Sequence, residues 1–96
     1  MRIRNFVHKG LKRLYEDDDP RGLPAACTDK LRKMLAFFEA MEDAGELRAV
    51  STWKAHALVG GRKGSWGLHV ARNWRVTFSI DPVEREICNL NFEDYH

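Results

Sequence analysis

The spacing of apolar residues changes once along this chain, and that change limits the folds open to it. In residues 24–42, "PAACTDKLRKMLAFFEAME", five apolar side chains recur at i, i+3, i+4 and i+7 with charges opposite: Leu31, Met34, Leu35, Phe38 and Met41. This spacing predicts an amphipathic helix whose apolar stripe faces the core. After "DAGEL" the apolar residues alternate with other residues, which is the period of a β-strand. Helices followed by strands are typical of a segregated α+β fold.

The alternating half predicts four strands joined by short turns. The expected strands are 52–59, 65–71, 75–80 and 87–92, and the turns are "GGRKG", "RNW" and "DPVERE". Short turns between consecutive strands favour an antiparallel meander. Before them we expect a short strand in "IRNF", a helix over 7–16 and the helix over 24–42. The predicted fold is therefore α+β, with two N-terminal helices packed on a small antiparallel sheet of four or five strands.

Length and charge limit the function further. The 96 residues are expected to form one domain, 1–96. No Asp or Glu occurs from Leu47 to Ile80, whereas "YEDDDP" alone supplies four carboxylates. Such asymmetry indicates a face that attracts phosphate, although a basic stretch is also ordinary solvent-exposed surface.

Targeting and cofactor signals are not evident in the sequence. No apolar run is long enough for a membrane span, and the start lacks a signal peptide, so we expect a cytoplasmic protein. Cys27 and Cys88 are far apart and follow no metal-binding pattern, so both are expected to be reduced. We expect no metal and no other cofactor.

Several side chains able to transfer protons or bind phosphate fall in the strand half. His56 lies on the first expected strand, Arg75 on the third, and Asp94, Tyr95 and His96 follow the fourth. Metal-free cleavage of RNA needs a base for the 2′-hydroxyl, a cation for the phosphate and an acid for the leaving 5′-oxygen. Histidine suits proton transfer near neutral pH, and arginine grips phosphate oxygens in pairs. Adjacent antiparallel strands can bring these residues to one surface.

Each candidate also has an ordinary structural role open to it. His56 fits a strand residue whose ring bonds a neighbour, Arg75 an exposed sheet residue, and Tyr95 a cap over the core. His69 is out of phase with the apolar residues of its strand and is either structural or a weak RNA contact. His8 is expected to be exposed in the first helix.

From "HKGL" to "EDYH" the chain resembles the HigB family of bacterial toxins, within the RelE/ParE superfamily of toxin–antitoxin systems. The pieces that carry this resemblance are "RNFVHKGLKRLYE", "HALVGGRKGSW", "NWRVTF" and "FEDYH". The resemblance implies a RelE-like fold and a metal-free endoribonuclease that cleaves messenger RNA in the ribosomal A site and so inhibits translation.

The resemblance also implies roles for individual residues. His56 matches the family's mid-sheet histidine, Arg75 its phosphate-binding arginine, and Asp94, Tyr95 and His96 its C-terminal trio. We take His56 as the base and His96 as the acid or electrostatic stabiliser, because the terminal carboxylate favours the imidazolium. The candidate RNA contacts are Lys54, Arg62, Lys63, Arg72 and Asn73.

The fit departs from the family after the histidine, where the usual pattern is His-Pro-Leu-Lys-Gly. Here Ala57 replaces the proline and Val59 the lysine, which removes one expected phosphate partner from the family's set. Two alternatives therefore stay open. One is a ParE-like inhibitor of DNA gyrase, against which His56 and "EDYH" argue; the other is a catalytically weak homologue that acts only as antitoxin partner. The implied partners are a helix-turn-helix, HigA-like antitoxin, the ribosome with its messenger RNA, and operator DNA bound through the antitoxin complex.

Overall fold

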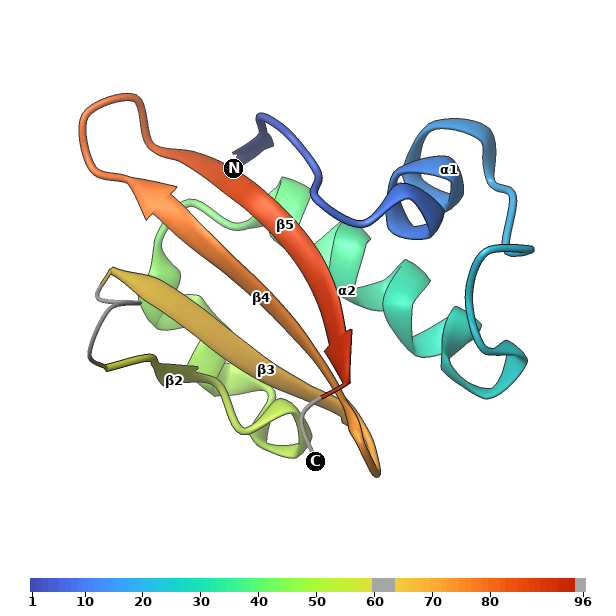
Figure 1. Ribbon diagram of the computed structural model, residues 1–96. Helices are drawn as coiled ribbons and strands as arrows, with labels where there is room; N and C mark the ends of the chain where they lie inside the picture. Colours follow the sequence, from blue (N-terminus) through green and yellow to red (C-terminus); the bar gives the residue numbers. More distant parts are fainter. Residues whose placement is uncertain (60–63, 95–96) are drawn as a thin grey trace.

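The chain forms a mixed five-stranded sheet with the long helix packed behind it (Figure 1). This computed structural model describes residues 1–59 and 64–94. The sheet order is β1-β5-β4-β3-β2, with β1 parallel to β5 and the other neighbouring pairs antiparallel. The strands are β1 (Arg2–Ile3), β2 (His56–Ala57), β3 (Ser65–Ala71), β4 (Trp74–Asp81) and β5 (Glu86–Asp94). The α-helices are α1 (Lys9–Asp17) and α2 (Thr28–Ala40), and 3-10 turns span Ala25–Cys27, Ala44–Ala49 and Ser51–Trp53.

The α+β class, the meander order and the last three strands are confirmed, and three details of the prediction are wrong. The helices lie towards the middle of the chain and are not N-terminal; they follow β1, which overlaps at Ile3 the short strand expected in "IRNF". The sheet is not wholly antiparallel, because β1 runs parallel to β5. The strand expected over 52–59 is confined to His56–Ala57, since residues 51–53 form a 3-10 turn and Lys54 has a φ of 47°. Left-handed backbone at Lys54 ends any extended run before β2.

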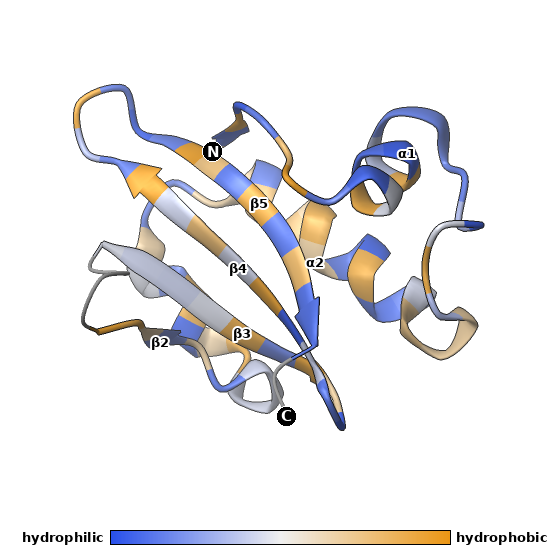
Figure 2. Cartoon of the chain, viewed as in Figure 1, coloured by the Kyte–Doolittle hydropathy of each residue, from blue (hydrophilic) through white to orange (hydrophobic). Residues whose placement is uncertain are grey.

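The core lies between α2 and the sheet, as the apolar spacing predicts. Leu31, Met34 and Phe38 are fully buried, and the Phe38 ring meets that of Phe78 on β4 at 5.1 Å between centroids. Figure 2 shows apolar residues recurring along α2 and alternating with polar ones along β4 and β5. Burying an aromatic side chain of this kind contributes about 1.5–3 kcal/mol. Because one face of the strands is used in this way, the alternating side chains of the other face are left for the pocket described below.

The 3-10 turn before β2 is anchored by Trp53. Its ring is buried and stands edge-on to that of Phe37, with centroids 5.1 Å apart. The buried Trp53 therefore fixes the start of the segment that carries Lys54 and His56. This placement matters because both line the candidate site.

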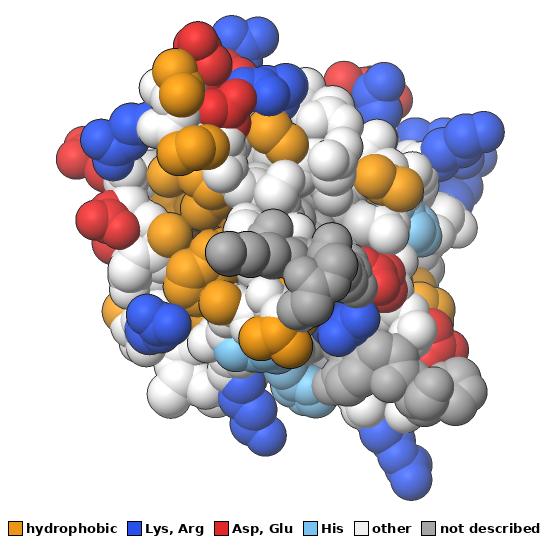
Figure 3. All heavy atoms as spheres, turned by 60° about the vertical axis from the view of Figure 1, so that its left-hand side comes forward, with side chains coloured by type: hydrophobic (Ala, Val, Ile, Leu, Met, Phe, Trp, Pro, Cys, Tyr) orange, Lys and Arg blue, Asp and Glu red, His pale blue; other side chains and the backbone are white. Residues whose placement is uncertain are grey.

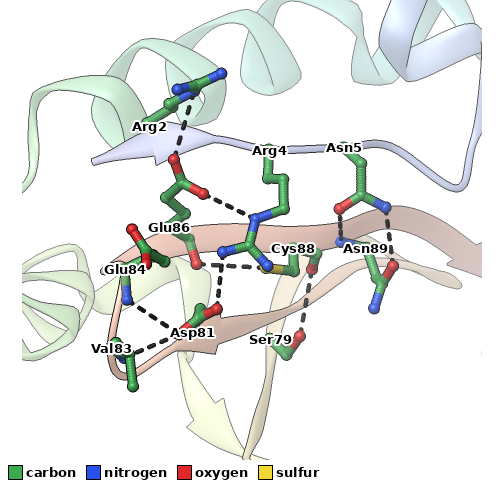
Figure 4. A network of polar contacts seen from close by, with 10 residues as sticks. All are labelled: Arg2, Arg4, Asn5, Ser79, Asp81, Val83, Glu84, Glu86, Cys88 and Asn89. Atoms are coloured by element: carbon green, nitrogen blue, oxygen red, sulfur yellow. Dashed lines mark hydrogen bonds and ion pairs between the residues drawn. The ribbon is translucent and has the colours of Figure 1, made fainter.

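A polar network holds β1 against β5 at the end of the sheet where the β4–β5 turn lies (Figure 4). The Arg4 guanidinium donates to Asp81 at 2.7 Å and to Glu86 at 2.8 Å, and Asn5 donates to Asn89 at 2.9 Å. The hydrogen bond from Arg4 lowers the pKa of the Asp81 carboxyl to about 2. These pairs are solvent-exposed, so they fix the position of β1 more than they stabilise the fold.

His8 does not have the exposed position in the first helix that the sequence suggests. It is the N-cap of α1, where its Nδ1 accepts a hydrogen bond from the Leu11 amide at 3.1 Å. Its half-buried ring stands edge-on to Phe92 of β5, and burial lowers its pKa below the ordinary 6.5. An accepting Nδ1 is unprotonated, so this cap requires the neutral ring.

In the described part of the chain, neither α-helix has the length and apolar character needed to cross a membrane. Cys27 and Cys88 are both buried and free, as expected.

Candidate active site

A pocket of about 230 Å³ lies on the sheet face that points away from the core. The residues lining it are Lys54, His56, His69 and Arg75. Two are permanent cations and two are imidazoles, and none of these described lining residues is acidic. Figure 3 shows histidine side chains next to Lys and Arg side chains on the lower part of this face. Such a pocket favours an anion such as a phosphodiester.

Strand register brings these residues together from three strands. His56 on β2 is opposite Gly67 on β3, and His69 on β3 is opposite Arg75 on β4. Gly67 and His69 are two residues apart and therefore share one face. Directly opposed side chains of antiparallel strands have Cβ atoms about 4.5–5.5 Å apart, and diagonal neighbours stay within reach of long side chains. His56, His69 and Arg75 thus surround a floor made by Gly67.

The imidazole of His56 lies over that glycine floor. A Cβ added to Gly67 would lie 3.3 Å from both Cε1 and Nε2 of His56, and 3.2 Å from Cδ2 of Leu58. His56 Nδ1 is 2.9 Å from the carbonyl oxygen of Lys54. A carbonyl only accepts, so Nδ1 carries the proton and Nε2 is left to exchange one. The left-handed backbone of Lys54 and the absent side chain of Gly67 together set this orientation.

Arg75 is oriented by Glu93, a residue that the sequence reasoning missed. Glu93 stands opposite Arg75 in the β4–β5 register, and its Oε1 lies 3.5 Å from Nη2 of Arg75. The other carboxylate oxygen accepts a hydrogen bond from the buried hydroxyl of Thr77. A carboxylate fixed at both oxygens limits the rotation of the guanidinium beside it. "FEDYH" contains Glu93, but its pairing with Arg75 depends on a register that local spacing does not specify.

His69 lines the pocket. The sequence left open whether it is structural or a weak RNA contact, and its position in the pocket is compatible with contact to a bound anion. Burial lowers its pKa below the ordinary 6.5, and the positive charges of Lys30 and Lys54 lower it further. Its signal in the sequence was its phase, opposite to Leu68 and Val70 on the same strand.

The remaining predicted site residues are placed as follows. Asp94 is exposed at the end of β5, opposite Trp74 and one residue beyond the Arg75–Glu93 pair. Arg72 and Asn73 form the exposed turn between β3 and β4, next to His69 and Arg75 along those strands. Arg62, Lys63, Tyr95 and His96 lie outside the described residues. Val59, which stands where the resemblance expects lysine, is 86% exposed.

One cation of the segment from Leu47 to Ile80, which contains no Asp or Glu, packs on an aromatic ring. The guanidinium of Arg48 lies over the ring of Trp66, 5.1 Å from the centroid. Within residues 1–59 and 64–94, no three His, Cys, Asp or Glu side chains are grouped so that they could hold a metal ion. The described pocket can therefore do two things with its own side chains: bind an anion and exchange protons at an imidazole.

Comparisons with known proteins agree on one family. A family model described as the RelE-like toxin of type II toxin-antitoxin system HigB matches residues 4–96. The Endoribonuclease HigB of Proteus vulgaris is 38% identical over 94 residues, which is 98% of this chain and 99% of that protein. A crystal structure of YafQ from E. coli strain BL21(DE3) superimposes with a TM-score of 0.59 at 13% identity, over 98% of this chain and 93% of that one. A YafQ mutant gives 0.58 at 14% with the same coverage. At these identities the YafQ structures establish a shared fold.

Proposed function

Because this chain belongs to the HigB family of RelE-like toxins from type II toxin–antitoxin systems, we propose that it is an endoribonuclease that cleaves messenger RNA and so stops translation. The observation that carries the proposal is the pocket in which His56 and Arg75 meet on the uncovered sheet face, together with Lys54. These are the residue types that metal-free RNA cleavage requires.

The proposed reaction is an internal attack of the RNA on its own backbone. His56 Nε2 takes the proton of a 2′-hydroxyl, and the freed oxygen attacks the adjacent phosphorus. Arg75 binds the non-bridging oxygens as their charge grows. The bond from phosphorus to the 5′-oxygen then breaks, and that oxygen receives a proton. The products are a 2′,3′-cyclic phosphate and a 5′-hydroxyl.

The leaving oxygen receives its proton from the end of the chain in this proposal. His96 acts as the acid, while Asp94 and Tyr95 complete the site. Support comes from β5, which carries Asp94 to one residue beyond Glu93, the partner of Arg75. Asp94, the last described residue of β5, thus lies at the end of the sheet where His69 and Arg75 also lie.

The wider contacts follow from charge and family. Lys54 in the pocket, Arg72 and Asn73 in the β3–β4 turn, and Arg62 with Lys63 are proposed to bind the RNA backbone. We place the reaction on messenger RNA held in the ribosome. Membership of a type II system implies an antitoxin; we propose that it is a HigA-like helix-turn-helix protein that brings the complex to operator DNA.

Primer extension on a messenger RNA, with and without programmed ribosomes, tests the proposal. The wild type should cut only with ribosomes, and His56→Ala or His96→Ala should reduce the rate by about 10²–10⁴. Arg2→Lys, a change at the far end of the sheet, is the matched control and should cut normally. No cutting combined with inhibition of gyrase would instead support a ParE-like activity, and neither activity would leave only an antitoxin partner.

The pH–rate profile separates base from acid. His56→Ala should remove the acidic limb of the profile, and His96→Ala the basic limb, because a base must be unprotonated and an acid protonated. Loss of the same limb in both variants would refute this division of roles.

A further inference from the structure

His69 is a second imidazole in the pocket that the reaction described above does not use. It is directly opposite Arg75 across β3 and β4, and it shares a strand face with Gly67, over which the His56 ring lies. A phosphate bound by Arg75 on this floor would therefore lie within reach of His69 as well. The position is internal to the site and not a separate surface.

Burial and nearby positive charges lower the pKa of His69 in the free protein. Lys54 and His56 face it from the segment that includes β2, Arg75 from β4 and Lys30 from α2. Glu93, the carboxylate opposite Arg75 on β5, is engaged with Arg75 and Thr77. Burial and the two lysines lower the pKa of His69, so the free pocket disfavours a further positive charge.

A phosphodiester reverses that balance because it brings a negative charge into the same space. Building on the proposed function, we propose that His69 takes up a proton as the RNA backbone enters the pocket and then binds the scissile phosphate together with Arg75. Substrate binding and proton uptake are thereby linked. Protonated His69 is thus an additional cation of the RNA-bound pocket.

The sign of the linkage follows from the two states. The bound form holds the extra proton more tightly than the free form, so affinity rises as pH falls from the pKa of the bound state towards the lower pKa of the free state. Each unit by which RNA raises the pKa gives up to tenfold in affinity across that window. The extra cation also adds one phosphate contact, which steepens the dependence of affinity on salt by about 0.7 for a single strand.

The experiment compares RNA binding by the full-length wild type and His69→Gln at pH 8.0 and pH 5.5. The probe is a short RNA oligonucleotide with 2′-methoxy sugars, which the protein cannot cleave because the attacking 2′-hydroxyl is blocked. The salt concentration is varied at each pH. We expect wild type to gain about three- to tenfold more affinity than the variant on acidification, and a salt slope steeper by about 0.7 only at the lower pH. His8→Asn is the matched control, since it removes a histidine outside the pocket and should behave as wild type.

A second measurement does not depend on the variant's folding. The ring signals of His69 in the wild type are titrated by NMR with and without inorganic phosphate, and the midpoint should rise when phosphate is present. Equal pH and salt dependence in wild type and His69→Gln, no binding of the probe at either pH, or an unmoved midpoint would each overturn the inference. These assays need no cleavage, so they test the inference separately from the proposed function. If the wild type cuts RNA but shows no proton-linked binding, the inference is wrong and the proposed function stands. If it shows proton-linked binding but cuts no RNA, the proposed function is wrong and the inference stands.

Discussion

Substituting Gly67 by alanine is the sharpest test of how this site is built. The added Cβ would meet Cε1 and Nε2 of His56 at 3.3 Å and Cδ2 of Leu58 at 3.2 Å. Comfortable contacts between such atoms are about 3.5–4.0 Å, so the imidazole must move by a few tenths of an ångström. A misplacement of about 1 Å can cost 10²-fold in rate, so this shift predicts a loss of roughly four- to tenfold. Alanine is a better strand residue than glycine by about 0.5–1 kcal/mol, so stability should not fall by more than about 1 kcal/mol.

The assay is single-turnover cleavage of messenger RNA on programmed ribosomes, with urea unfolding of the same preparations. Gly45→Ala is the matched control, because its new Cβ would meet only the side chain of Asp43, at 3.4 Å, and Gly45 lies on an exposed turn that contributes no residue to the pocket. It should leave the cleavage rate unchanged. A Gly67→Ala protein that cleaves within twofold of wild type would refute the idea that the glycine floor positions His56. A large drop in the free energy of unfolding would show instead that the contact is resolved by distorting the sheet.

Three other substitutions test separate parts of the structure. Glu93→Gln should lower kcat about tenfold without raising KM, because Arg75 loses its orienting charge while the phosphate loses a nearby carboxylate; single-turnover kinetics would contradict this by showing a raised KM and an unchanged kcat. His8→Asn should flatten the pH dependence of stability in urea unfolding. Because burial holds the pKa of His8 below 6.5, the unfolded chain is protonated first, so wild-type stability is full above that pH and declines below it; an equal decline in the variant would count against the cap. Val59→Lys should tighten RNA binding and steepen its salt slope by about 0.7, and an unchanged slope would show that this exposed position does not meet the backbone.

Local patterns in the chain were sufficient for its larger elements. The stripe from Leu31 to Met41 predicted α2 and its buried face, and alternation predicted β3, β4 and β5. Both predictions succeed because one face of each element packs on a single core, so the spacing of apolar residues follows the period of the helix or strand. The same alternation showed that His69 and Arg75 face away from that core. The family was also evident from short motifs, since the chemistry of the site uses residue types that few other roles require together.

Only the tertiary structure decided how those residues meet. The register places Glu93 against Arg75 and His69 beside them, and no local spacing specifies which residues of two strands are paired. The left-handed backbone of Lys54 shortens β2 and aims its carbonyl at His56, which alternation alone could not predict. The parallel closure of β1 on β5 likewise depends on contacts between the two ends of the chain. Periodicity reports the environment of one segment, whereas a site assembled from several strands depends on their relative placement, and that is fixed by packing over the whole molecule.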